Sequence, residues 1–489
     1  MHTKRSSSSV LVITNWRDLA HPDAGGAELL CDELARGFGR NGWDVVFLTA
    51  AVEGAPTTEG RDGYTIIRRG GRYTVYPWAL AWILVHRRAV RAAVDSENGI
   101  PFFSPLVLPR RTPVLLLLHH VHQDQFAQYF SPLAAAVGRV LERTGSRLVY
   151  RHRTVVAISP STRSGARRRL GLRGDIVVVP PGCNAVVNPP AGPRPRSVKP
   201  RLVCVGRLVP HKRTGLVIGA MARLAERIPD LELHLVGDGP ERVLLHQQVR
   251  QLQLEDRVVL HGALDDADRD ALMATAWMTV NASEREGWGL SVVEANALGV
   301  PVLAYRRPGL RDSIRHGATG WLIDDDADLA DEIARALGQL ADPEFAEMVG
   351  ERARQWVSRF TWEAMTDGML DVLLAEEGRL AHLPGERRIP TDLATVVTVP
   401  KELLGADTQP VFRGTDRVRM EDGGLVVLLR GADTQTARLA LRRAGFTPAV
   451  IDHPSVRVSV ARPADHVSPE GVEGWSLGND HWREDTLAG

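Results

Sequence analysis

The stretch of sequence that decides the fold is NASEREGWGLSVVEA, residues 281–295. The short apolar run before it, Trp277 to Val280, is typical of a buried strand, and a helix is expected to begin near Leu290. Glu286 lies just before that helix and Glu294 lies inside it, so two carboxylates can face one cleft. The N–H groups that are free at the start of a helix suit a phosphate. Carboxylates for hydroxyls and amides for phosphate together suit a sugar nucleotide.

An isolated Glu-Gly-x-Gly segment would indicate only a capped helix start with two solvated acids. Here the segment also resembles the Glu-x7-Glu signature of the family 4 glycosyltransferases, usually E-G-F/W-G-L-x-x-x-E-A. The matching positions are Glu286, Gly287, Trp288, Gly289, Leu290, Glu294 and Ala295. The resemblance implies the GT-B fold, an α/β architecture of two facing Rossmann-like domains with a cleft between them. It also implies a retaining glycosyltransferase that moves a sugar from a nucleoside-diphosphate-sugar donor to an acceptor, with no cofactor and no bound metal.

The length of 489 residues is too great for one ordinary core, so two domains and an extension are expected. We expect an N-terminal Rossmann-like domain on the acceptor side over residues 1–190 and a nucleotide-sugar-binding domain over residues 191–360. A helix that crosses back onto the first domain is expected at residues 361–380. A small α/β extension without assigned chemistry is expected at residues 381–489.

The composition is that of an ordinary soluble globular protein, with 24% charged and 44% hydrophobic residues. No apolar run approaches the roughly 18 residues of a membrane-spanning helix. The three cysteines, Cys31, Cys183 and Cys204, stand at no metal-ligand spacing, so neither a disulfide framework nor a zinc site is supported. We therefore expect a cytoplasmic protein, with the inner face of the membrane as the alternative location.

The first domain is expected to open with a strand over Val10–Thr14, a polar loop over residues 15–26 and a helix over Ala27–Asn41. This order is the start of a nucleotide-fold βαβ unit. The loop lacks the G-x-G-x-x-G dinucleotide fingerprint. By resemblance, its Gly25 and Gly26 lie beside the donor phosphates.

A cluster of histidines follows the most apolar segment of the first domain. Residues Pro113 to Leu118 are continuously apolar, as expected of a central parallel strand that is covered on both faces. The strand delivers His119, His120 and His122 to its carboxyl end, where open α/β sheets bind ligands. No spacing around them completes a metal site. By resemblance, His119 faces the transferred sugar, with His120 as the fallback.

Two helices are expected in this domain from their apolar patterns, at Pro77–Val94 and at Leu133–Val149. The second helix gathers apolar residues on one side: Leu133, Val137, Val140, Leu141 and Leu148. It also carries a basic stripe at intervals of four residues: Arg139, Arg143, Arg147 and Arg151. A solvated basic face is the default explanation of the stripe. The alternative is peripheral contact with an anionic membrane; no nucleic-acid partner is expected.

In the second domain, short apolar runs alternate with helical patterns, which favours a parallel sheet. After its first strand come Arg207 and Lys212, two cations in one loop that can clamp a diphosphate without a metal. They match the family's G-R-L-x-x-x-K, which implies that they are the diphosphate ligands. The same resemblance puts Gly237 in a strand-end turn and Leu264 in the region that cradles the base.

The resemblance implies a role for each of these residues. Arg207, Lys212 and the amides near Gly289 and Leu290 would stabilise the leaving diphosphate. Glu294 would bind the ribose hydroxyls, Glu286 the hydroxyls of the sugar ring, and His119 would position that sugar. The implied catalytic residues are His119, Glu286, Arg207 and Lys212. The implied donor-binding residues are Gly25, Gly26, Arg207, Lys212, Gly237, Leu264, Gly287, Trp288, Gly289, Leu290 and Glu294.

The identity of the donor and of the acceptor stays open, with a cell-envelope lipid, a glycan and a secondary metabolite as candidate acceptors. Two other functions also stay open at this point. One is another GT-B enzyme, such as a nucleotide-sugar epimerase. The other is a catalytically silent protein that binds sugar nucleotides.

Overall fold

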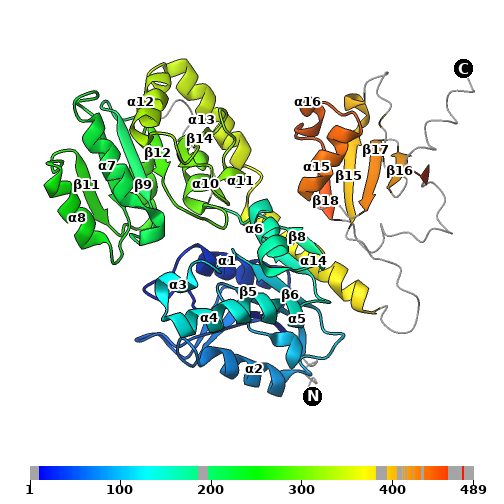
Figure 1. The fold of residues 1–489 in the computed structure, drawn as a ribbon. Helices are drawn as coiled ribbons and strands as arrows, with labels where there is room; N and C mark the ends of the chain where they lie inside the picture. Colours follow the sequence, from blue (N-terminus) through cyan, green and yellow to red (C-terminus); the bar gives the residue numbers. More distant parts are fainter. Residues whose placement is uncertain are drawn as a thin grey trace, which may run out of the picture. The chain divides into compact units, whose positions relative to one another are not determined.

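The structure, a computed structural model, contains three β-sheets with their helices (Figure 1). It describes residues 10–184, 196–381, 394–404, 410, 412, 416–421, 423–430, 434–460 and 476–477. The chain divides into two compact units, one of residues up to Val179 together with those from Thr366 onward, and one of residues Pro180–Met365. The domain boundary expected at residue 190 lies outside the described residues, as does much of the expected extension.

The first sheet has the strand order β3-β4-β2-β1-β5-β6-β7-β8. All neighbours in it are parallel except β3 and β4. Its strands are β1 (Val10–Thr14), β2 (Asp44–Thr49), β3 (Thr58–Arg61), β4 (Tyr64–Arg68), β5 (Val90–Glu97), β6 (Val114–Leu118), β7 (Val155–Ala157) and β8 (Ile176–Val178). Every residue of β6 is buried, as its continuous apolar run predicts.

The helices that accompany this sheet are short apart from the first two. They are α1 (Gly26–Arg40), α2 (Val75–His86), η1 (Ser104–Leu106), α3 (Phe126–Tyr129), α4 (Pro132–Val140), η2 (Leu141–Gly145), α5 (Ser146–Val149), α6 (Pro160–Gly165) and η3 (Ala166–Leu170). The helix expected over Pro77–Val94 ends at His86, so the later part of that prediction was wrong. Val90 already belongs to β5, which pairs with β1 and β6 in the centre of the sheet.

The second sheet has the strand order β11-β10-β9-β12-β13-β14, and all its neighbours are parallel. Its strands are β9 (Arg201–Val205), β10 (Glu232–Val236), β11 (Val258–Gly262), β12 (Met278–Asn281), β13 (Val302–Tyr305) and β14 (Gly320–Ile323). Its helices are η4 (Pro210–Lys212), α7 (Thr214–Leu224), α8 (Arg242–Gln251), α9 (Asp266–Ala274), α10 (Leu290–Ala297), α11 (Leu310–Ser313), α12 (Leu329–Leu340) and α13 (Pro343–Val357). The alternation of strand and helix predicted from the sequence is therefore confirmed.

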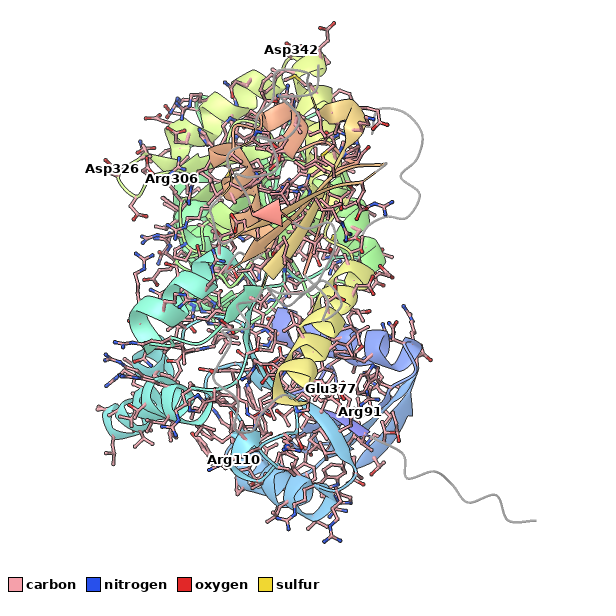
Figure 2. All side chains as sticks on the ribbon, turned by 90° about the vertical axis from the view of Figure 1, so that its right-hand side faces the viewer. Arg91, Arg110, Arg306, Asp326, Asp342 and Glu377 are labelled. Atoms are coloured by element: carbon pink, nitrogen blue, oxygen red, sulfur yellow. The ribbon has the colours of Figure 1, made fainter. Side chains whose placement is uncertain are left out.

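From Thr366 onward, helix α14 (Trp362–Ala381) belongs to the same compact unit as the first sheet. Its Glu377 lies beside Arg91, with 3.3 Å between the guanidinium and the carboxylate (Figure 2). Thr154 donates its hydroxyl to buried Glu376 at 2.9 Å, and Arg379 donates to the carbonyl of His152 at 2.7 Å. The helix that was expected to cross back onto the first domain therefore makes specific polar contacts there.

The third sheet is antiparallel and has the order β18-β15-β17-β16-β19. Its elements are β15 (Ala394–Pro400), η5 (Lys401–Leu403), β16 (Arg417–Glu421), β17 (Gly424–Arg430), α15 (Thr434–Arg443), α16 (Pro448–Ile451), β18 (Arg457–Val460) and β19 (Ser476–Leu477). It has an apolar core of its own, which includes Val397, Val427, Leu441 and Phe446. Across the described part of the chain, no helix has the length and apolar character that a membrane crossing needs.

The edge of the second sheet depends on one glycine. Gly320 has φ +151°, and a Cβ at this position would lie 2.1 Å from the carbonyl oxygen of Val302. We expect Gly320→Ala to lower the free energy of unfolding by at least about 2 kcal/mol, because the backbone of β13 must move. Gly338, in the exposed face of α12, has open space around it. Gly338→Ala is the control and should be neutral or raise stability by up to about 1 kcal/mol in urea unfolding. Equal effects of the two substitutions would contradict this account.

Candidate active site

The first part of the candidate site is the loop after β9, which carries Arg207 and Lys212. Gly206 donates its N–H to the carbonyl of Val236, so this loop begins against the end of β10. The turn after β10 presses closely on it: a Cβ at Gly237 would stand 2.1 Å from the carbonyl oxygen of Gly206. Gly237 has φ +133°, in the region that favours glycine. Its role in the structure is thus to let two backbones meet beside the cations.

The second part is the loop after β12, which carries Glu286. Strand β12 pairs with β9, and this pairing brings the two loops together. The ammonium of Lys212 lies 2.5 Å from a carboxylate oxygen of Glu286. Next to this ion pair, the N–H of Glu284 donates to the carbonyl of His211 at 2.8 Å. Two loops separated by about seventy residues in the sequence are therefore joined by charge and by backbone hydrogen bonding.

Arg213 makes a further connection between the loops, and sequence reasoning missed it. Its Nε–H donates to the carbonyl of Ala282 at 2.7 Å, and its guanidinium lies over the ring of Tyr305, 4.7 Å from the ring centre. Its φ of +51° is unusual for a residue with a side chain. The only sequence signal was its position directly after Lys212. The function of Arg213 in the structure is to hold the backbone of the Glu286 loop.

The pKa values of the two carboxylates of the site are shifted in opposite directions. Burial acts to raise the pKa of Glu286, but the adjacent Lys212 ammonium outweighs burial and holds the pKa below its ordinary value. Burial raises the pKa of Glu294, which Arg269 at 3.9 Å only partly opposes. Glu286 is consequently held as a carboxylate, whereas the cation beside Glu294 is more distant and does not outweigh burial.

Helix α10 begins where the sequence predicted, at Leu290. Gly289 precedes it with φ +90°, a conformation that glycine adopts without strain. The ring of Trp288 is buried and meets Phe360 edge to face, with 5.0 Å between the ring centres. Trp288 therefore packs in the core and anchors the start of the helix, while the free N–H groups of α10 lie at the end of the loop that carries Glu286.

A small pocket lies between the two loops. The side of the β9 loop contributes Gly206, Arg207 and Lys212, and the side of the β12 loop contributes Asn281, Ala282 and Ser283. Its floor includes Cys204, where burial raises the thiol pKa to about 12. Both predicted cationic ligands, Arg207 and Lys212, therefore line this pocket. Glu286, Glu294, Gly237 and Leu264 are not among its lining residues.

The predicted residues of the first domain lie at the carboxyl edge of the first sheet. His119 follows β6, and its Nε2 lies 2.8 Å from the hydroxyl of Ser96 on β5. Burial, with contributions from His120 and His122, lowers the pKa of His119 to about 3. His119 is therefore a neutral imidazole at physiological pH. The alternative residue, His120, lies 2.8 Å from the side-chain oxygen of Gln125.

Gly25 and Gly26 lie at the start of α1, where Glu28 reaches back to accept the N–H of Gly25 at 2.7 Å. Glu28 is buried and also pairs with Arg17 at 3.1 Å. This arrangement fixes the loop between β1 and α1 from inside, and sequence reasoning missed both charged residues. The signal was present as Glu28 at the third helical position, where a capping glutamate is common.

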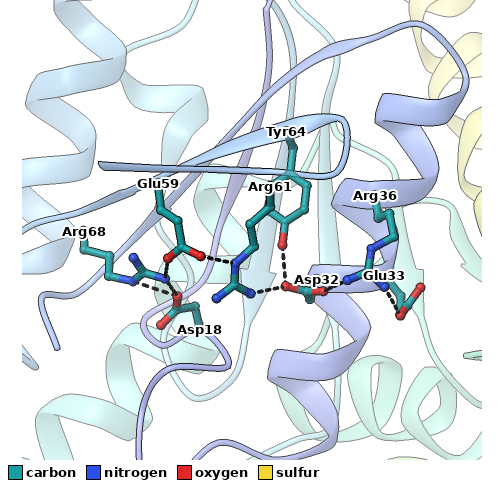
Figure 3. A network of polar contacts seen from close by, with 8 residues as sticks. All are labelled: Asp18, Asp32, Glu33, Arg36, Glu59, Arg61, Tyr64 and Arg68. Atoms are coloured by element: carbon teal, nitrogen blue, oxygen red, sulfur yellow. Dashed lines mark hydrogen bonds and ion pairs between the residues drawn. The ribbon is translucent and has the colours of Figure 1, made fainter. Parts of the chain in front are cut away.

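A network of charges holds the same loop from the other side (Figure 3). Buried Arg68 donates from Nε to Asp18 of the loop at 2.8 Å and also pairs with Glu59 at 2.7 Å. Arg61 continues the network from Glu59 to Asp32 on α1, at 2.7 Å and 2.9 Å. The hairpin β3–β4 and helix α1 thus clamp the two ends of the loop that contains Gly25 and Gly26.

The structure brings Arg207, Lys212, Glu286 and the start of α10 together in one unit. Gly25, Gly26 and His119 belong to the other unit. Among the residues that the structure describes, no group of three His, Cys, Asp or Glu side chains is placed to hold a metal ion.

Two family models match the chain. The one described as Glycosyltransferase Family 4 covers residues 24–186, and the one described as Glycosyl transferases group 1 covers residues 192–356. Among curated proteins, the GDP-mannose-dependent alpha-(1-6)-phosphatidylinositol monomannoside mannosyltransferase of Mycolicibacterium smegmatis is 31% identical over 298 residues, which are 58% of this chain and 73% of that protein. The N-acetyl-alpha-D-glucosaminyl L-malate synthase of Bacillus anthracis is 38% identical over 148 residues, which are 30% of this chain and 37% of that protein.

Among solved structures, the sucrose-phosphate synthase of Thermosynechococcus elongatus superposes with a TM-score of 0.61 at 23% identity, over 74% of this chain and 97% of that chain. This likeness shows the fold, and the likeness to the mannosyltransferase shows the family. The chain belongs to glycosyltransferase family 4 and has the GT-B fold.

Proposed function

We propose that this chain transfers a sugar from a nucleoside-diphosphate-sugar donor to an acceptor, with retention at the anomeric carbon and without a bound metal. The observation that carries the proposal is the ion pair of Lys212 and Glu286 across two loops, with Arg207 and Lys212 lining one pocket. Two cations suit a diphosphate, and a carboxylate beside them suits the hydroxyls of the sugar attached to it.

The chemical need that these residues meet is the charge of the leaving group. As the bond between sugar and phosphate breaks, negative charge gathers on the diphosphate. The guanidinium of Arg207, the ammonium of Lys212 and the free N–H groups at the start of α10 are proposed to stabilise it. These groups are fixed before the reaction, because the loops that carry them are joined through Glu284 and Arg213.

The two carboxylates are proposed to have different partners. Glu286, which Lys212 keeps ionised, binds hydroxyls of the transferred sugar and steadies the positive charge that develops at the anomeric carbon. Glu294, which lies 3.9 Å from the guanidinium of Arg269, accepts hydrogen bonds from the ribose hydroxyls. His119 is proposed to position the sugar as a neutral imidazole, since its pKa of about 3 removes its charge.

GDP-mannose is the first donor to test, because the relative from Mycolicibacterium smegmatis is named as GDP-mannose-dependent. The same name describes a phosphatidylinositol mannoside as the molecule acted upon. We therefore propose a lipid acceptor for this chain as well. An enzyme with such an acceptor needs a surface that binds a membrane.

The segment α4-η2-α5 offers such a surface. Four apolar side chains of its expected apolar side, Leu133, Val137, Val140 and Leu148, are each more than half exposed. The basic stripe of Arg139, Arg143, Arg147 and Arg151 runs along the same segment. Exposed apolar side chains flanked by arginines are the pattern of a helix that lies in the interface of an anionic membrane. We propose that this segment docks the protein on such a membrane.

The donor assignment predicts the effect of removing Arg207. Arg207→Ala should weaken the binding of free GDP about tenfold or more and slow transfer from GDP-mannose, since it removes charge-assisted hydrogen bonds worth about 1.5–3 kcal/mol. Titration calorimetry and a transfer assay measure both effects. The control is Arg227→Ala, which removes an exposed arginine of the same unit that pairs with Asp331. If GDP and the other common nucleoside diphosphates bind Arg207→Ala as tightly as the unmodified protein, the clamp assignment is wrong.

Metal independence is tested by chelation. Transfer should survive dialysis against EDTA, because protein cations and helix amides take the part that a divalent ion has in other transferases. Activity that disappears with EDTA and returns with Mg²⁺ or Mn²⁺ would show that the reaction uses a metal.

The membrane surface is tested with vesicles. The protein should sediment with anionic phosphatidylglycerol vesicles, bind less as salt rises, and ignore vesicles of neutral phosphatidylcholine. Arg143→Glu with Arg147→Glu should weaken this binding at least about thirtyfold, at about 1 kcal/mol for each residue near the surface. Leu133→Ser with Val137→Ser should weaken it through lost apolar burial. The control pair, Arg223→Glu with Arg227→Glu, changes the same charge elsewhere. Binding that responds neither to lipid charge nor to the test pairs would contradict the proposal.

A further inference from the structure

Lys212 and Glu286 are proposed to bind different parts of the donor, and in this structure they form an ion pair with each other. The ammonium of Lys212 and a carboxylate oxygen of Glu286 are 2.5 Å apart, and both side chains are largely buried, with 20% and 15% of their surface exposed. Neither charge is therefore stabilised mainly by water. Whatever enters the site and draws Lys212 toward itself changes the environment of Glu286 as well.

The consequence depends on whether the ligand brings a sugar. An intact donor supplies a diphosphate for Lys212 and hydroxyl donors for Glu286, so both members of the pair have a partner. A free nucleoside diphosphate supplies only the anion. Lys212 then lies between two negative groups, and the buried carboxylate of Glu286 loses part of the stabilisation that Lys212 provides without gaining a sugar hydroxyl.

We propose that the Lys212–Glu286 ion pair makes the site discriminate the intact sugar-nucleotide donor from the free nucleoside diphosphate that the reaction releases. This inference rests on the proposed function, since it takes that site as the donor site. In it, Glu286 favours release of the product after transfer, in addition to its contact with the sugar. Both residues are needed for this discrimination. Lys212 binds the anion of either ligand, and Glu286 is stabilised by a hydroxyl only when the ligand carries the sugar.

The loop that carries Glu286 is held in place by contacts other than the Lys212–Glu286 ion pair. The carboxylate of Glu286 is therefore not needed to fix the loop. The N–H of Glu286 donates to the carbonyl of Pro308 at 3.2 Å, and the N–H of Glu284 donates to that of His211. Gly309 lies so close to this backbone that a Cβ there would stand 2.3 Å from the carbonyl oxygen of Glu286. Arg213 holds the carbonyl of Ala282. None of these contacts uses the side-chain charge of Glu286.

The test compares two ligands on the full chain by calorimetry: free GDP, and GDP-mannose in the absence of acceptor. If UDP or ADP binds better than GDP, that diphosphate and a sugar nucleotide that contains it replace GDP and GDP-mannose. Glu286→Gln keeps the size of the side chain and removes its charge. We expect it to bind the free nucleoside diphosphate about tenfold tighter, a change of about 1.4 kcal/mol. We expect it to bind the donor no tighter than the unmodified protein does, so that the preference for the donor falls.

Two further variants separate the pair from general effects of charge. Glu284 is exposed in the same loop, and Glu284→Gln removes the same charge two residues away. It should change the affinity for either ligand by no more than about twofold. Glu286→Asp keeps the charge and should retain weak binding of the free diphosphate, which also covers the case in which Glu286→Gln fails to fold.

The outcomes separate this inference from the proposed function. If Glu286→Gln binds the free diphosphate as weakly as the unmodified protein or more weakly, while the unmodified protein transfers sugar, the discrimination by the ion pair is wrong and the transferase stands. Equal tightening in Glu284→Gln would likewise overturn it. If the unmodified protein binds none of the nucleotides, the proposed function fails and the inference fails with it.

Discussion

The pairing of β12 with β9 is the constraint on which the candidate site depends. These strands are neighbours in the sheet, with Met278 opposite Leu202, although more than seventy residues separate them in the chain. Because the sheet is parallel, the loops that follow both strands emerge at the same edge. A cation that follows the first strand therefore meets a carboxylate that follows the fourth. Without this strand order, Lys212 and Glu286 would be two unrelated charges in solvated loops.

The sequence was sufficient to predict the structure where the local residue pattern agrees with the tertiary contacts of the segment. The start of α10 at Leu290 follows from Gly289 directly before it, and the burial of β6 follows from its apolar run. It was insufficient where tertiary pairing decides the structure. The segment Val90–Val94 is the end of the run from Pro77 that has a helical pattern. It nevertheless forms a strand, because it pairs with β1 and β6. For Arg213 the sequence offered only its position directly after Lys212, since its role is a contact with a carbonyl in a distant loop.

In the first domain, buried acids connect the surface proposed for membrane docking to the histidine loop. Glu142 lies in the π-helical turn η2 and accepts hydrogen bonds from the N–H of His122 and from Gln123. Burial raises its pKa to about 7, and it also raises the pKa of the neighbouring Glu97, which accepts the hydroxyl of Ser146. The amphipathic segment and the loop after His119 are thus joined by hydrogen bonds, so displacement of one must move the other.

The neutral state of His119 has a consequence for how the protein responds to acidity. With a pKa of about 3, its imidazole gains no proton at any pH found in a living cell. Glu286, whose pKa lies below its ordinary value, stays ionised over the same range. The hydrogen-bond donors and acceptors that these two side chains present are therefore constant, and a change in acidity leaves the part proposed for them in recognising the sugar unaltered.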